Sequence, residues 1–145
     1  MKIPRLPQLA AFVIAFACLF TTKTFAQTFT AKYTSIVGNT GGYWEYLPVN
    51  YNAAGNTKKY PLILFSQGLG ELGDGSPAML PDILKVGLPR VLSSGGFPAT
   101  FTVNNETFSF IVISPQFRQA PSVNDWQTIM NYAIQNFVLI RTAFI

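Results

Sequence analysis

The chain has 145 residues, of which 49% are hydrophobic and 11% are charged, and its formal net charge at pH 7 is +4. It contains no histidine and a single cysteine, Cys18. Because zinc and copper sites depend on imidazole and thiolate ligands, this composition argues against both metals, and we expect no metal site and no cofactor.

The first 26 residues have the features of a secretory signal. Lys2 and Arg5 precede the apolar stretch Leu9–Phe20, and Thr24–Ala26 has the small residues of a cleavage site. The apolar stretch is too short to cross a bilayer, which takes about 20 residues. We therefore expect residues 1–26 to be a signal peptide, the protein to be secreted or periplasmic, and the mature chain to have no stable membrane span.

Removal of the signal changes the charge balance. Three of the ten basic residues (Lys2, Arg5 and Lys23) lie in it, so seven remain against six acidic residues, and the mature charge is about +1. A chain so nearly neutral lacks the basic surface that nucleic acids require, so we expect no nucleic-acid partner. Cys18 is removed as well, which excludes a disulfide and a thiol nucleophile.

The mature chain is predicted to open with β-structure and then to alternate strands with helices. Short apolar runs predict buried strands, and an apolar stripe at helical spacing that Gly87 and Pro89 interrupt predicts a broken helix. Ser122, with Asp125 three residues later, predicts a helix start. In chain order we expect strands at Phe29–Val37, Tyr43–Pro48 and Pro61–Phe65, a broken helix at Leu80–Ser93, a strand at Thr107–Ser114, and a helix after Ser122.

This order predicts an α/β fold with an antiparallel hairpin at its start, followed by a parallel βαβ unit. We expect Phe110–Ser114 to pair in parallel with Leu62–Phe65. In about 119 mature residues there is little chain to cover both faces of such a sheet. We therefore expect one apolar face to be poorly covered and to favour self-association.

The segment Tyr60–Gly75 carries the strongest functional signal. A buried strand runs into Gln67-Gly68-Leu69-Gly70, and glycines allow the sharp turns that aim backbone N–H groups at a reacting carbonyl oxygen. We expect an oxyanion-hole loop at Gly68, Leu69 and Gly70, with the N–H of Leu69 as the first choice of donor and that of Gly70 as the second. A plain strand-to-helix turn is the alternative interpretation.

Two residues flank this loop as candidates for its support. Gln67 has an amide that can hydrogen-bond the loop, and Glu71 has a carboxylate that can accept backbone N–H bonds. A solvated surface position is the alternative for Glu71.

Six segments, spread in order through most of the mature chain, carry a resemblance to a known family: Gly42–Pro48, Lys58–Phe65, Gly68–Gly75, Gly87–Pro89, Phe110–Gln116 and Trp126. Together they resemble the secreted phospholipase/carboxylesterase-like (polyhydroxybutyrate-depolymerase-like) branch of the α/β-hydrolases. The resemblance implies an N-terminal half of an α/β-hydrolase sheet and an intact relative that cleaves esters with a Ser-His-Asp triad. The family usually has a histidine where this chain has Gln67.

The catalytic groups of that family are missing from this sequence. No G-x-S-x-G nucleophile elbow occurs, and no histidine can act as the base. Ser66 does not form an elbow, because Leu64 rather than glycine lies two residues before it. We therefore expect no catalytic residue in this chain, no ester hydrolysis by it, and an ester substrate only for an intact family member.

The last residues depart from the family. After Tyr132–Asn136 the family continues with a basic-x-Asp-Pro-x-Arg-Ile-Tyr turn and strand, whereas this chain reads FVLIRTAFI. Codons that encode this tail can, in another frame, encode Arg-Ile-Asp-Pro-Asn-Arg-Ile-Tyr. We expect residues 27–145 to be a partial α/β-hydrolase domain, and our hypothesis is a frameshift near Asn136 that makes residues 137–145 a frameshifted tail.

Two other classes of function compete with this interpretation. Tyr43, Trp44 and Tyr46 could form the stacking platform of a secreted carbohydrate-binding module, although aromatic residues on a strand usually divide between core and surface. The chain could instead be a membrane-anchored subunit whose sheet is completed by a partner chain that carries the serine and the histidine.

Overall fold

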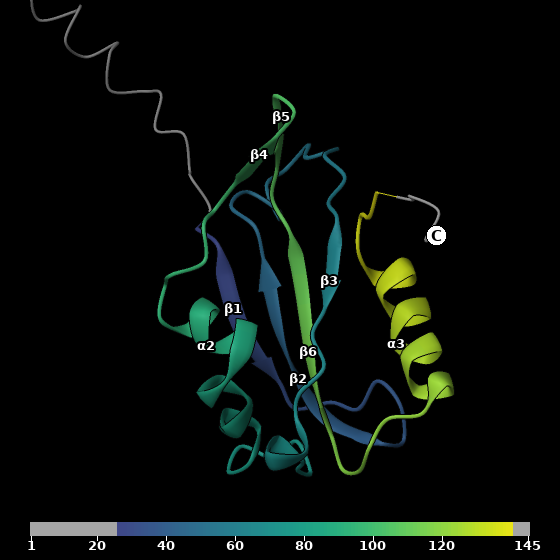
Figure 1. The fold of residues 1–145 in the computed structure, drawn as a ribbon. Coiled ribbons are helices and arrows are strands. Elements are labelled where there is room, and N and C mark those ends of the chain that lie inside the picture. Colours follow the sequence, from purple (N-terminus) through teal and green to yellow (C-terminus); the bar gives the residue numbers. More distant parts are fainter. Residues whose placement is uncertain (1–25, 141–145) are drawn as a thin grey trace, which may run out of the picture.

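The computed structural model of the chain describes residues 26–140, so the predicted signal peptide, except for its last residue, and the last five residues of the frameshift hypothesis lie outside the described residues. A four-stranded sheet forms the centre, with strand order β1-β2-β6-β3 (Figure 1). Its strands are β1 (Thr28–Lys32), β2 (Thr40–Leu47), β3 (Leu62–Leu64) and β6 (Ile111–Phe117).

The sheet mixes antiparallel and parallel pairing. β1 pairs with β2, and β2 pairs with β6, in antiparallel fashion, whereas β3 and β6 are parallel with Leu62 opposite Ile111 and Leu64 opposite Ile113. The opening hairpin and the parallel pair are both confirmed. The fold is therefore of mixed α/β content, with a mostly antiparallel sheet and one parallel pair.

The connection from β3 to β6 contains the predicted broken helix. A 3-10 helix, η2 (Leu80–Lys85), is followed by helix α2 (Gly87–Ser93), and the extended residue Val86 (φ −136°, ψ 157°) separates them. Gly87 begins α2 with φ +55°, and a Cβ atom there would lie 2.6 Å from Cζ of Phe65. The break thus falls where the chain passes so close to the strand end that only glycine fits.

Helices α2 and α3 (Val123–Asn136) lie on opposite sides of the sheet (Figure 1). Helix α3 packs Ala133 against Ile113 and Tyr43, and on the other face Leu92 of α2 packs against Val112 and Tyr46. Strand residues alternate between the faces, so neighbours such as Val112 and Ile113 enter different clusters. The bare apolar face expected from the sequence therefore carries helical cover among the described residues.

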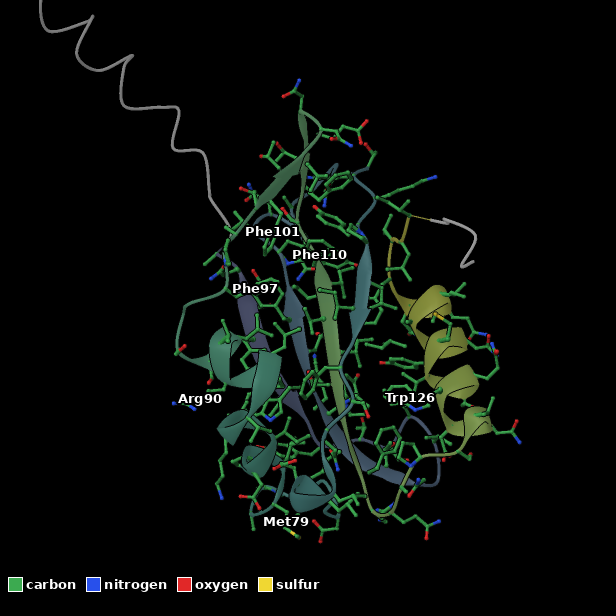
Figure 2. All side chains as sticks on the ribbon, viewed as in Figure 1. Met79, Arg90, Phe97, Phe101, Phe110 and Trp126 are labelled. Carbon is green, nitrogen blue, oxygen red and sulfur yellow. The ribbon has the colours of Figure 1, made fainter. Side chains whose placement is uncertain are left out.

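The prediction of one strand over Thr107–Ser114 is wrong. A hairpin of β4 (Phe101–Val103) and β5 (Glu106–Phe108) ends there, and β6 begins only at Ile111. The hairpin turn uses Asn104 and Asn105 at φ +49° and +62°, which the preferred two-residue hairpin turns require and asparagine tolerates. Phe110 turns towards Phe101, with ring centroids 5.2 Å apart, and Phe97 lies beside them (Figure 2).

The first predicted strand is too long. β1 ends at Lys32, because the following turn is organised by Thr40, whose Oγ1 accepts hydrogen bonds from the N–H groups of Ile36 (3.1 Å) and Val37 (3.2 Å). β2 begins at this Thr40 rather than at the predicted Tyr43.

Residues 137–140 start a further pairing beyond β3. The N–H of Tyr60 donates to the carbonyl of Val138 (3.0 Å), and the N–H of Ile140 donates to the carbonyl of Tyr60 (2.9 Å). Leu139 forms an isolated parallel bridge with Tyr60, and Phe137 packs in the core. The described part of the tail therefore lies next to β3, on the side away from β6.

Candidate functional site

The predicted oxyanion loop occupies residues 66–76 and follows β3 directly. It leaves the sheet at the carboxyl end of β3, beside the carboxyl end of the parallel strand β6, which is where ligand sites of open α/β sheets lie. Gly68 is extended (ψ 174°), and the short 3-10 helix η1 (Leu69–Glu71) follows it. Gly68, Leu69 and Gly70 are exposed, and Leu69 is 77% exposed. The three predicted residues thus form the exposed end of the loop, which is called the loop tip below.

Gln67 fixes the strand side of this tip. Its Nε2 donates to the carbonyl of Phe117 (3.2 Å), and its Oε1 accepts from the N–H of the same residue (3.3 Å). A side-chain amide that bonds both main-chain groups of one residue acts as a two-point clamp. Gln67 therefore ties the loop to the end of β6.

Gln116 fixes the far side, and sequence reasoning did not single it out for this role. The residue is fully buried; its Nε2 donates to the carbonyls of Glu71 (3.0 Å) and Met79 (2.9 Å), and its Oε1 accepts from the N–H of Gly75 (3.0 Å). The sequence signal for it was only a polar residue at the end of an otherwise apolar strand. Its partners lie 37 to 45 residues away in the chain, which no local pattern records.

Glycines let the loop pack against β2 backbone to backbone. A Cβ atom on Gly41 would lie 1.4 Å from the carbonyl oxygen of Asp74, and one on Gly75 would lie 2.0 Å from the nitrogen of Gly42. Gly73 also approaches Gln116 closely, since its Cβ would lie 2.6 Å from Nε2. Side chains at these positions would force the loop away from the sheet.

Asp74 and Arg118 close the base of the loop. Arg118 Nη1 donates to the carbonyls of Gly38 (2.7 Å) and Thr40 (3.0 Å), which holds the end of β6 to the start of β2. The N–H of Ser76 donates to Asp74 Oδ1 (2.9 Å). Hydrogen bonds from Ser76, helped by the positive charge of Arg118, lower the pKa of the Asp74 carboxyl.

Glu71 contributes through its main chain. Its carbonyl accepts the bond from Gln116, while its carboxylate folds back over Gly68, where a Cβ atom would lie 2.8 Å from Oε2. The negative charge thus stands beside the exposed tip.

The two serines nearest the loop have no basic partner. Ser66 is exposed, and its Oγ donates to the carbonyl of Gln67 at 3.4 Å. Ser114 is fully buried on β6, and its Oγ has no hydrogen-bond partner among the described residues. Neither hydroxyl meets a group that could take its proton.

The aromatic residues of β2 are divided between the two faces of the sheet. Tyr43 is 3% exposed and shares a 2.7 Å hydrogen bond with Tyr132, whereas Tyr46 is 3% exposed on the opposite face. Burial raises the pKa of both phenols, and for Tyr43 the bond to Tyr132 adds to the effect. Trp44 is half-buried, stacks on Phe29 and donates from Nε1 to the carbonyl of Leu80 (3.1 Å). These rings do not form one exposed platform.

Residues 26–140 show neither a metal site nor a membrane-crossing element. No three His, Cys, Asp or Glu side chains in this range are grouped so that they could hold a metal ion. The helices described here are all too short or too polar to traverse a bilayer.

No protein-family model matches the chain, and a search of curated proteins finds no match.

Proposed function

We propose that the chain carries the oxyanion-loop half of a secreted serine-type ester hydrolase of the α/β-hydrolase class. The observation that carries this proposal is the anchored loop after β3, whose exposed tip consists of Gly68, Leu69 and Gly70. The supporting frame is held from both sides by Gln67 and Gln116.

The sheet topology supports this class. β6 lies between β2 and β3, so the connection after β3 returns towards the start of the sheet, and α3 then leads to Leu139 beyond β3. Connections that leave in opposite directions place helices on opposite faces, because such crossovers are nearly always right-handed. A doubly covered sheet with a loop at the carboxyl ends of its parallel strands is the arrangement on which hydrolase sites are built.

The loop tip is suited to binding an oxyanion. Leu69 and Gly70 occupy the first positions of η1, whose N–H groups have no carbonyl of their own turn to bind. One such donor is worth roughly 10²–10³ in rate when it meets the developing negative charge of a tetrahedral intermediate. We assign Leu69 as the principal donor and Gly70 as the second.

In this proposal the chain supplies the donors that stabilise the oxyanion, but not the nucleophile or the base. Since its sequence contains no histidine and no nucleophile elbow, the proposal assigns no catalytic residue to it. The serine and the histidine would come from sequence encoded after Asn136 in another frame, as the frameshift hypothesis states. The aromatic alternative loses support, because a sugar platform needs exposed ring faces and Tyr43 and Tyr46 are each 3% exposed.

The decisive test is the nucleotide sequence of the locus through codon 137 and several hundred bases beyond. We expect another frame to encode a G-x-S-x-G within a few dozen codons and a histidine further on. A locus with no hydrolase remnant in any frame would contradict the proposal.

An activity assay complements the sequencing. The full chain is expected to hydrolyse short p-nitrophenyl esters no faster than buffer, whereas a gene with the reading frame restored should encode an active esterase. In the restored enzyme, Leu69→Pro removes the proposed donor and should lower kcat by about 100-fold. Undiminished activity of that variant would remove the oxyanion assignment.

A further inference from the structure

We infer that Gln116 is the positioning residue of the loop tip: it sets the main-chain geometry of Leu69 and Gly70 from inside the fold, without touching substrate. An effect of Gln116 on catalysis rests on the proposed function. Its effect on the geometry of the loop rests only on the hydrogen bonds of its buried side-chain amide.

Both N–H groups and the oxygen of the Gln116 side-chain amide form hydrogen bonds. Nε2 has two N–H groups, and they go to the carbonyls of Glu71 and Met79; Oε1 takes the N–H of Gly75. The side chain is fully buried, so leaving any of these groups unpaired costs about 1–3 kcal/mol. A unique amide orientation satisfies all three partners, and it therefore specifies where they lie.

The bond to Glu71 is the one that reaches the tip. Glu71 is the last residue of η1, and its N–H donates to the carbonyl of Gly68 (3.3 Å). Gln67 holds the residue before Gly68, so the tip is bounded on one side by the Gln67 clamp and on the other by Gln116. Three residues between two fixed ends have little freedom to turn their N–H groups away.

The close approach of Gly73 shows that the space around this amide is tight. A Cβ at Gly73 would lie 2.6 Å from Nε2 and 2.9 Å from Oε1 of Gln116, and the N–H of Gly73 donates to the carbonyl of Phe117 (2.9 Å). The loop thus wraps round the amide, and a side chain of another shape would not reproduce these contacts.

Amide hydrogen exchange on the ¹⁵N-labelled full chain tests the inference. Gln116→Met keeps the approximate shape of the side chain and removes its hydrogen bonds, and Gln116→Asn keeps an amide that is too short to reach all three partners. Gln135→Met, at an exposed position on α3, is the matched control. The reporters are the N–H groups of Gly75 and Glu71, compared with that of Ile113 in the sheet.

Both Gln116 variants should exchange the N–H of Gly75 about tenfold faster, because it loses its acceptor and one net hydrogen bond is worth about that factor. The N–H of Glu71 should also exchange faster, because its bond to Gly68 is no longer held in place through the Glu71 carbonyl, and Ile113 should be unchanged. Equal acceleration at all three sites would mean that Gln116 supports only global stability, and an unchanged Glu71 would mean that the tip is set elsewhere; either result overturns the inference. Should the Met variant fail to fold, the Asn variant carries the same test.

A second readout separates this inference from the proposed function. Exchange does not depend on hydrolysis, so a locus without an elbow would remove the enzyme and leave the exchange result standing. In an active restored enzyme, Gln116→Asn should lower kcat by at least about tenfold and leave KM within about twofold, as expected for a group felt only in the transition state. A rise in KM with kcat unchanged would overturn the positioning role.

Discussion

The loop at residues 66–76 and helix α3 are held in the fold in different ways. The loop is fixed by side chains from other elements, above all Gln116 of β6, and by backbone contact with Gly41 and Gly42 of β2. Helix α3 begins at its own capping box, in which Ser122 and Asp125 bond each other's main chain. Its attachment to the sheet is a stripe of buried side chains that includes Ile129 and Ala133.

This difference predicts how each region responds to damage. The conformation of the loop depends on its contacts with β2 and β6. A substitution that disturbs either strand should therefore displace the loop tip, even where the strand itself still forms. The capping box of α3 is formed by residues 122–125, with one added bond from Asn39 to Asp125, and should survive most changes elsewhere. Substitutions on each side test this contrast.

The largest effect is expected from Ile129→Ala on the helix side. Ile129 is fully buried, and removing its side chain should lower the free energy of unfolding by about 3–4 kcal/mol, from lost burial and the cavity left behind. Urea denaturation followed by circular dichroism measures the change. Ile134→Ala on the same helix is the control, because Ile134 is 44% exposed and should lose far less. Equal losses at the two positions would show that α3 is not anchored by its buried stripe.

Gly41→Ala should be the most damaging small change on the loop side. The new methyl would lie 1.4 Å from the carbonyl oxygen of Asp74, so two backbones must separate, at a cost of about 2–3 kcal/mol in the free energy of unfolding. Gly38→Ala is the matched control, since a Cβ there meets nothing within 4 Å. Spectra of the loop amides should change in the first variant and not in the second; a tolerant Gly41 would refute the close backbone packing.

Removing the cap of α3 should have a smaller effect. Ser122→Ala deletes the hydroxyl that accepts from the N–H of Asp125 (3.2 Å) and should lower the free energy of unfolding by about 1 kcal/mol. Gln135→Ala, exposed on the same helix, should change it little. The loop amides should keep their exchange rates in Ser122→Ala, and acceleration there would show that the two regions are coupled.

The pH dependence of the cap should be the smallest of these effects. Hydrogen bonds from the N–H of Ser122 in the first place, and from Asn39, lower the pKa of Asp125 below its usual value of about 3.9. A lowered carboxyl pKa stabilises the fold above the unfolded-state pKa, and that stabilisation is lost as the pH falls through the folded-state value. Asp125→Asn should therefore differ from the parent in urea midpoint at pH 6 and approach it near pH 2. A constant difference across that range would rule out a contribution from ionised Asp125.

The same contrast explains how much the sequence could predict. The start of α3 at Ser122 and the break before Gly87 follow from signals within a few residues, and both are confirmed. The parallel pairing of β3 with β6 could be expected from two short apolar runs around a helix. The positions of Gly68, Leu69 and Gly70 after a strand could likewise be predicted, although that strand, β3, is half-buried rather than buried and their role stays a prediction.

The sequence analysis missed one long-range feature and one local feature. Gln116 reads as a polar residue at a strand end, and its three partners come from a loop that is remote in the chain. The β4–β5 hairpin is local, and it was missed because Thr107–Ser114 reads as one continuous strand although Asn104-Asn105 just before it is a turn signal. Periodicity identifies a strand but not the point at which it changes partners.

The two side-chain amides that hold the loop also determine how its conformation responds to pH and ionic strength. Gln67 and Gln116 hold the tip through carboxamides, which neither gain nor lose a proton between strong acid and strong alkali and whose bonds ionic strength scarcely screens. A histidine at position 67 would instead change charge near pH 6.5. The two amide clamps therefore keep their bonds whatever the pH or the salt concentration, whereas strong acid weakens the loop at its base, where the Asp74 carboxylate accepts from the N–H of Ser76.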